Sequence, residues 1–120
     1  YLTGKITAQT KLDAKTDLRA GFDRFKPDAM LANQPIVDFL QQFAASRGAT
    51  PAQVALAWLL AKKPFIVPIP GTRNPAHLKE NLGAVHVRLT SAEVAQLDAK
   101  FSQFKVHGGR MNEMQMKIVE

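Results

Sequence analysis

The segment from Val67 to Asn81 holds the residue types and spacing best suited to chemistry. A short apolar run leads into the turn Pro70-Gly71, and then into Thr72, Arg73 and Asn74 at the start of a predicted helix. Unpaired backbone N–H groups and the helix dipole favour an anion at such a position. Arg73 adds a permanent charge, while Thr72 and Asn74 can donate hydrogen bonds to phosphate oxygens. The pattern indicates a phosphate site; the alternative is a well-capped helix with an incidental surface arginine.

Further along the same predicted helix, His77, Glu80 and Asn81 could hold a planar ring. His77 and Glu80 are three residues apart and therefore share a helix face. A base could stack on His77 while Glu80 or Asn81 bonds its amino and ring nitrogens. The alternative is a solvated helix face near a C-terminus, and these residues alone do not decide between the two.

A second candidate for ligand binding lies at the start, in Leu2-Thr3-Gly4-Lys5. Gly4 would let the backbone approach a ligand closely, and Lys5 could meet a phosphate. Arg19 and Arg24 either fold over the same ligand or form salt bridges with Asp17 and Asp23.

Residue types and spacing exclude several other chemistries. The chain has no cysteine, which rules out disulfides, thiolate nucleophiles and cysteine-based zinc sites. No nucleophile-elbow motif is present. The histidines are too scattered for a metal-ligand set: His77, His86 and His107. The methionines near the end are interpreted as packing contacts of a terminal helix: Met111, Met114 and Met116. Three acids on predicted helices are interpreted as surface charges: Asp38, Glu93 and Asp98.

Composition predicts one globular domain with a basic surface. The 120 residues are 46% hydrophobic and 22% charged, with a formal net charge of +6. The longest apolar run, Val54 to Ala61, is too short to span a bilayer, so we expect a cytoplasmic protein without a membrane partner. The positive charge favours an anionic partner. Because no Lys/Arg run is interleaved with aromatics, we expect no nucleic acid; a basic surface without a specific partner is the alternative.

Helix signals begin after a long polar stretch. Residues 1–32 are predicted to be a loop with one short helical turn, and long loops of this kind often bind ligands. Asn33 is then expected to cap a helix with Pro35 in its first turn. Apolar residues follow at helical spacing from Ile36 to Ala44, and Arg47-Gly48 supplies the stop signal.

Three further helices carry local start signals. Thr50-Pro51-Ala52-Gln53 forms a capping box, and the apolar helix that follows needs cover on several sides before it ends at Lys62-Lys63-Pro64. Asn74-Pro75 starts a helix that ends near Leu82, with Gly83 as its stop. Thr90 opens a second capping box, followed by one apolar stripe that runs to Phe104. Residues Met111 to Val119 are expected to add another helical turn.

A buried strand is predicted at Phe65-Ile66-Val67, between the second and third of these helices. Helix-then-strand spacing is typical of a parallel α/β architecture. A lone buried strand would leave ladder donors and acceptors unpaired on both edges. We therefore expect its neighbouring strands to lie in sequence outside this chain.

Four phrases resemble one family, the aldo-keto reductases. Tyr1 to Ile6 is similar to the phrase after their seventh barrel strand, and Thr50 to Leu60 to their seventh major helix. Ile66 to Asn81 resembles the eighth strand, its turn and the next helix, and Thr90 to Leu97 resembles the helix after that. The resemblance implies the C-terminal portion of a (β/α)8 TIM barrel, helix-dominated with one clear buried strand. Its parts would be a cofactor-covering loop region (1–32), a helix-helix-strand-helix-helix unit (33–105) and a tail (106–120).

The same resemblance implies NADP(H) as cofactor and gives roles to the candidate residues. Backbone around Leu2, Gly4 and Lys5 would cover the pyrophosphate. The residues after the Pro70-Gly71 turn, which are Thr72, Arg73 and Asn74, would hold the 2′-phosphate. His77 stands where relatives often carry Arg or Gln near that phosphate and the adenine. Two residues would hydrogen-bond the adenine, namely Glu80 and Asn81, and Arg19 would belong to the loop that folds over the cofactor.

The resemblance assigns no catalytic residue to this chain. The family transfers hydride with a Tyr acid beside Asp, Lys and His in the first half of the barrel, and Tyr1, the one tyrosine here, falls in the cofactor loop. The complete enzyme would reduce a small-molecule aldehyde or ketone with NADPH, whereas this chain alone would be inactive and could self-associate through exposed core surfaces. The alternative is a small, non-enzymatic basic domain that binds an anionic partner.

Overall fold

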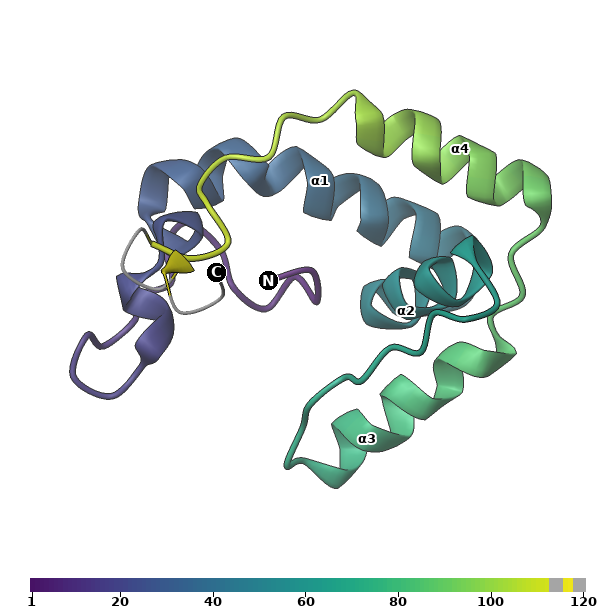
Figure 1. Ribbon diagram of the computed structural model, residues 1–120, viewed down its shortest axis with the longest axis horizontal. Coiled ribbons are helices and arrows are strands. Elements are labelled where there is room, and N and C mark those ends of the chain that lie inside the picture. The colour runs from purple at the N-terminus through teal and green to yellow at the C-terminus, as the bar shows by residue number, and fades with distance from the viewer. Residues whose placement is uncertain (113–115, 118–120) are drawn as a thin grey trace.

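A computed structural model of the chain describes residues 1–112, 116 and 117. Within these residues the chain forms helices joined by extended segments and turns, and no strand. Figure 1 shows the four α-helices set in an open arc around the amino-terminal segment. In chain order the elements are η1 (Leu18–Gly21), η2 (Asp23–Phe25), α1 (Pro27–Ser46), α2 (Pro51–Lys62), α3 (Pro75–Leu82), η3 (Gly83–His86) and α4 (Ser91–Ser102).

Helix α1 starts earlier than the sequence signals indicate. It begins at Pro27, whose fixed φ and missing N–H suit the first helical position. The predicted loop at 1–32 therefore ends sooner, and it contains two short 3₁₀ turns. Pro35 lies inside the helix, where it cannot donate to the carbonyl of Leu31. Leu31 itself is exposed.

The predicted starts of the other three helices are confirmed. Thr50 accepts a hydrogen bond from the Gln53 backbone (3.2 Å), and the Gln53 side chain accepts one from the Thr50 N–H (3.0 Å). Thr90 and its partner three residues on form the same capping box at α4. Asn74 caps α3, and Gly83 ends it before the chain continues as η3.

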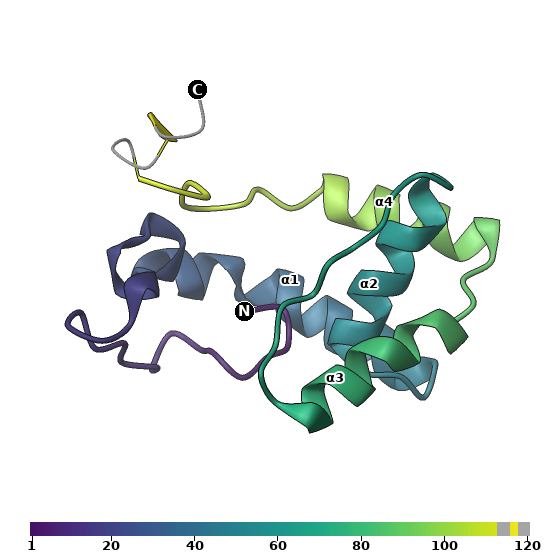
Figure 2. The same cartoon turned by 60° about the horizontal axis from the view of Figure 1, so that its bottom comes forward.

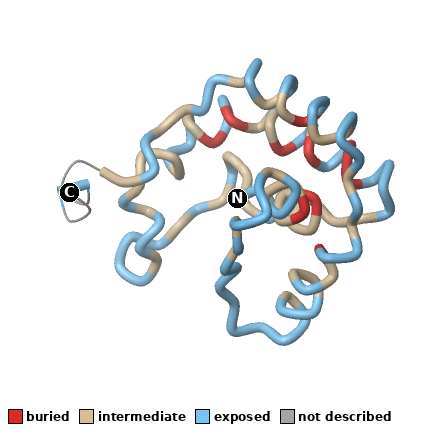
Figure 3. Tube along the Cα trace, turned by 45° about the vertical axis from the view of Figure 1, so that its right-hand side comes forward, coloured by how far each residue is buried: buried red, intermediate tan, exposed pale blue. Residues whose placement is uncertain are grey.

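The core lies where α1, α2 and α4 meet, and Figure 3 shows buried positions gathered along the helices. Its buried centre is formed by residues from all three: Leu40, Phe43, Ala44, Val54 and Leu97. An aromatic group closes one side, with the Phe101 ring 5.6 Å from Phe39 and 5.9 Å from Trp58. The apolar stripe predicted for α4 therefore supplies both core and edge.

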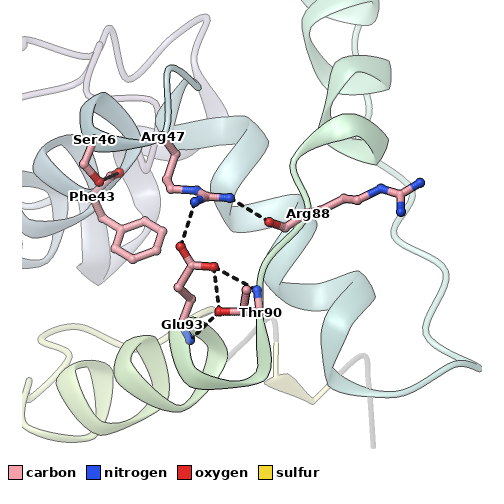
Figure 4. Close-up of polar contacts among 6 residues, drawn as sticks. All are labelled: Phe43, Ser46, Arg47, Arg88, Thr90 and Glu93. Atoms are coloured by element: carbon pink, nitrogen blue, oxygen red, sulfur yellow. Dashed lines mark hydrogen bonds and ion pairs between the residues drawn. The ribbon is translucent and has the colours of Figure 1, made fainter.

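Arg47 joins the end of α1 to the start of α4 (Figure 4). Its guanidinium lies 3.0 Å from a Glu93 carboxylate oxygen and donates to the Arg88 carbonyl at 2.8 Å. The hydrogen bond from the Thr90 backbone, more than Arg47, holds the pKa of Glu93 below its usual value. Glu93, predicted to be a surface charge, is thus part of a cap and an ion pair.

The buried strand predicted at Phe65–Val67 is wrong. Phe65 lies in a turn that the Ile66 N–H closes onto the Lys63 carbonyl (3.1 Å). Residues 66–70 have no regular secondary structure, and no strand among the described residues pairs with them. Phe65 and Val67 are each 78% exposed and Ile69 is 92% exposed. Helix α2 also lacks cover, since Val54 and Ala57 are its only buried apolar residues.

The tail is tied to α1 by a buried polar side chain. Asn33, predicted to be a cap, is only 2% exposed and lies within α1. Its amide donates to the His107 carbonyl and accepts from the His107 N–H, both at 2.8 Å. Arg24 donates to the Gly108 carbonyl at 3.3 Å, so it binds the tail rather than Asp17 or Asp23. The further helical turn predicted at 111–119 falls largely outside the described residues.

Asp98, also predicted to be a surface charge, accepts hydrogen bonds from the Lys62 ammonium and the Trp58 indole, each at 2.7 Å. The bond from Lys62, then that from Trp58, holds the pKa of Asp98 below its usual value. This contact is present above the carboxyl's ordinary range, near pH 4, and is lost as pH falls through the lowered value.

We therefore expect the fluorescence of Trp58, the single tryptophan, to change in a step below about pH 4 because its charged partner is protonated there. An acid titration of the emission spectrum measures this step. Asp98→Asn keeps an acceptor without the charge and should remove the step; its persistence in the variant would assign it to another carboxyl.

Candidate functional site

One polar cavity collects most of the predicted binding residues. Its volume is ≈ 450 Å³, and it lies where the amino-terminal segment, the start of α2, the 70–72 turn and α3 meet. Figure 2 shows the amino-terminal segment passing beside the extended segment that leads into α3. The lining residues are Thr3, Lys5, Thr50, Pro51, Ala52, Pro70, Gly71, Thr72, His77, Glu80 and Asn81.

Two basic side chains meet across this cavity. The Lys5 Nζ lies 3.1 Å from the His77 Nε2, although the residues are 72 positions apart in sequence. A lysine ammonium has donors only, so this contact requires the His77 Nε2 to accept. The amino-terminal segment is thereby held against the first turn of α3.

At the start of α3, Thr72 and Asn74 accept backbone hydrogen bonds, whereas Arg73 is exposed to solvent. Asn74 accepts from the Ala76 N–H at 2.9 Å, and Thr72 accepts from the Asn74 N–H at 3.1 Å. The Thr72 hydroxyl hydrogen and the Asn74 amide hydrogens remain able to donate. Arg73 is exposed beside the cavity and forms no ion pair within the described part of the chain.

Glu80 and Asn81 form the inner wall of the cavity. The Glu80 carbonyl accepts from the Gln53 side chain at 2.9 Å, which fixes α3 against the start of α2. Gly83 permits this approach, because a Cβ there would lie 2.5 Å from the Gln53 Nε2. The Glu80 carboxylate and the Asn81 amide have no hydrogen-bond partner among the described residues, so both are available to a ligand.

Gly4 shapes the segment that carries Lys5. Its φ is +75°, a left-handed conformation that favours glycine, and its N–H closes a turn onto the Tyr1 carbonyl at 3.0 Å. A Cβ at Gly4 would lie closer to the Gln41 amide than real contacts allow. The turn therefore depends on this glycine and brings the backbone to the edge of the cavity.

Two predicted site residues lie elsewhere. Leu2 lines a separate apolar cavity of ≈ 720 Å³, together with Trp58 and Phe101. Arg19 pairs with Asp17 at 2.6 Å, and its hydrogen bonds lower the pKa of Asp17 to about 2. Of the two alternatives for Arg19, the structure has the ion pair.

Sequence reasoning missed the contribution of α2 to the cavity. Thr50, Pro51 and Ala52 are visible in the sequence only as a helix start, yet they form one wall. Their capping pattern gives no signal that a ligand cavity lies beside them. Within the described residues, no cluster of His, Asp and Glu suits a metal ion, and no helix has both the length and the apolar character needed to cross a membrane.

Comparisons with known proteins give a consistent match. The sequence model of the aldo/keto reductase family matches residues 3–101. The chain is 35% identical over 110 residues to "Aldo-keto reductase yakc [NADP(+)]" of Schizosaccharomyces pombe, covering 92% of this chain and 32% of that protein. It is 31% identical over 119 residues to "Aldo-keto reductase str7" of Strobilurus tenacellus, covering 99% and 35%.

A shorter stretch is more similar still. Over 59 residues the chain is 52% identical to "Pyridoxine 4-dehydrogenase" of Escherichia coli, covering 49% of this chain and 21% of that protein. The chain thus spans about a third or less of the length of these curated relatives. No solved structure gives a significant match.

Proposed function

The chain belongs to the aldo/keto reductase family, and from this premise we propose that its polar cavity binds the phosphate-bearing half of NADP(H). The observation that carries the proposal is the convergence of Lys5, Thr72, His77, Glu80 and Asn81 on one cavity. They come from two stretches of sequence far apart in the chain, and they combine basic groups with free polar groups. The name of the Schizosaccharomyces pombe relative includes NADP(+), which supports the same cofactor here.

The polar groups at the cavity suit the parts of this cofactor. Arg73, together with the donors of Thr72 and Asn74 at the start of α3, would take the 2′-phosphate, where the helix dipole also favours an anion. The Glu80 carboxylate and the Asn81 amide would hydrogen-bond the adenine. A role for Leu2 or Arg19 requires these side chains to move, because neither lines the polar cavity.

The exposed apolar surfaces support a wider architecture. The extended segment at 65–69 and the uncovered face of α2 are surfaces that barrel strands would cover. We infer that the chain corresponds to the C-terminal portion of a (β/α)8 barrel, with a loop region that ends where α1 begins at Pro27, a helical unit from α1 to α4 and a tail after α4. Left alone, the same surfaces favour self-association.

The complete protein would be an oxidoreductase that reduces a small aldehyde or ketone. NADPH, when bound, supplies the hydride. This chain would contribute cofactor binding and orientation, because none of its residues is assigned to the proton-donating tetrad. On its own it would therefore bind nucleotide without turning over a carbonyl substrate.

A calorimetric titration with NADP⁺ and NAD⁺ tests the cofactor assignment. The chain is expected to bind NADP⁺ about tenfold more tightly, since a charge-assisted pair with Arg73 adds about 1.5 kcal/mol. Arg73→Ala should weaken NADP⁺ binding by that factor and leave NAD⁺ unchanged. Arg88→Ala removes an exposed arginine that does not line the cavity and serves as the matched control.

Equal affinity for NAD⁺ and NADP⁺ would contradict the role of Arg73. Random-sequence duplex DNA at moderate salt provides a comparison polyanion. Tight, strongly salt-dependent DNA binding without nucleotide binding would favour the non-enzymatic basic domain instead.

A further inference from the structure

The contact between Lys5 and His77 is unusual because it joins two basic side chains. Its 3.1 Å distance is that of a hydrogen bond, and the ammonium can only donate. The His77 Nε2 must therefore carry a lone pair, with the ring proton on Nδ1.

Few charged or titratable groups line the cavity around His77. The charged or titratable groups that line the cavity are Lys5, from the amino-terminal segment, and His77 and Glu80, from α3; α2 contributes only Thr50, Pro51 and Ala52. Arg73 lies just outside. His77 is also in the first turn of α3, where the helix dipole favours an anion.

A phosphoryl group would require the His77 Nε2 to donate a hydrogen bond instead of accepting one. Its oxygens accept hydrogen bonds, so a ligand that replaces Lys5 as the partner of Nε2 needs a donor there. The imidazole can supply it by moving its proton from Nδ1 to Nε2, or by binding a second proton at the Nε2 lone pair. The second route keeps the Nδ1 proton and places a positive charge beside the anion.

We propose that a phosphoryl group of the ligand inserts between the Lys5 Nζ and the His77 Nε2, and that His77 takes up one solvent proton as it does so. This inference rests on the proposed function, which identifies the ligand as a dinucleotide. The anion neutralises the repulsion from Lys5 and so favours the protonated ring. The two residues then bind the phosphoryl group from opposite sides.

Proton uptake makes the affinity depend on pH. Because the protonated ring binds the anion, the gain in affinity is fully present at low pH and is lost as pH rises. Linkage limits the fall to about tenfold per pH unit for one proton. Imidazole changes charge between about pH 5 and 8, so the effect falls in the physiological range.

Calorimetry in two buffers of different ionisation enthalpy counts the protons. Binding of NADP⁺ near neutral pH should take up as much as about one proton, and His77→Gln should lose the share that belongs to the imidazole. The 2′-phosphate itself titrates near pH 6, so NAD⁺, whose pyrophosphate stays ionised, is measured in parallel. Uptake with both nucleotides assigns the pyrophosphate to the Lys5–His77 gap, and uptake with NADP⁺ alone assigns the 2′-phosphate.

His86→Gln is the matched control, because His86 is exposed and does not line the cavity. Nitrogen NMR of the imidazole rings gives a second readout that needs no variant. The His77 Nε2 should be unprotonated in the free chain, and both ring nitrogens should be protonated in the complex.

Nucleotide binding with no proton uptake, or with a proton that only moves from Nδ1 to Nε2, would overturn this inference and leave the proposed function standing. An unprotonated Nδ1 in the free chain would also contradict it. A chain that binds neither nucleotide would overturn both proposals.

Discussion

Replacing Leu97 with alanine is expected to lower the free energy of unfolding by about 2–5 kcal/mol. Leu97 is fully buried and packs with Leu40, Phe43 and Val54, so the substitution leaves a cavity at the meeting point of α1, α2 and α4. A domain of this size is stable by only about 5–15 kcal/mol, and a short list of fully buried residues places this chain towards the lower limit. Urea unfolding followed by circular dichroism and Trp58 fluorescence measures the loss.

Leu31→Ala is the matched control for this experiment. The same atoms are removed from a helix interior, but Leu31 is 64% exposed, so the free energy of unfolding should change by no more than about 0.5 kcal/mol. Equal losses at the two positions would mean that Leu97 is not at the centre of the core.

The second large effect is expected at Gly108, where the tail crosses the amino-terminal half. Its φ is +80°, and a Cβ would lie 2.6 Å from both the N and the Cα of Arg24. Gly108→Ala should push the tail away and break the two hydrogen bonds between Asn33 and His107. We expect a loss of about 2–4 kcal/mol in the free energy of unfolding, together with faster exchange of the His107 amide proton.

Two other glycines separate the causes of that loss. Gly48 also has a positive φ (+59°), but a Cβ there meets no atom within 4 Å, so Gly48→Ala should cost only about 1–2 kcal/mol. Gly21→Ala has open space and no positive φ, and it should be neutral or stabilise by up to about 1 kcal/mol. A cost at Gly108 no greater than at Gly48 would show that the close approach to Arg24 does not constrain the tail.

Helix starts could be predicted where local chemistry decides them. The capping boxes at Thr50 and Thr90 and the cap at Asn74 each satisfy backbone donors within a few residues, and all three helices begin there. The start of α1 could not be predicted in the same way. Asn33 has the side chain of a cap, but its partner is His107, and nothing local to Asn33 indicates that distant contact.

The prediction of a strand at 65–67 was wrong because it depended on neighbouring strands. Apolar, β-branched residues predict burial only if other strands cover them, and none of the described residues does so. The same limit applies to α2, whose apolar character was clear from the sequence but whose cover was not. A pattern of apolar residues indicates that a segment needs cover, whereas its burial depends on whether other elements pack against it.

The candidate site was predicted in part. Helix-start chemistry predicted the polar groups at Thr72 to Asn74, and the shared face of α3 predicted that His77 and Glu80 would lie together. Neither signal could predict that Lys5 reaches His77, because that contact joins segments far apart in the chain. Arg19 was predicted to fold over the cofactor, but in the structure it forms an ion pair with the neighbouring Asp17.

The extended segment before α3 has two unequal edges. Successive residues of an extended chain direct their N–H and C=O groups to opposite sides, and proline has no N–H. The side that carries Pro68 and Pro70 therefore lacks two donors, whereas the side that carries Val67, Ile69 and Gly71 keeps all of its donors. A strand that docks here can form an uninterrupted ladder along the Val67–Gly71 side alone. The two prolines therefore decide which edge of this segment can pair with another strand.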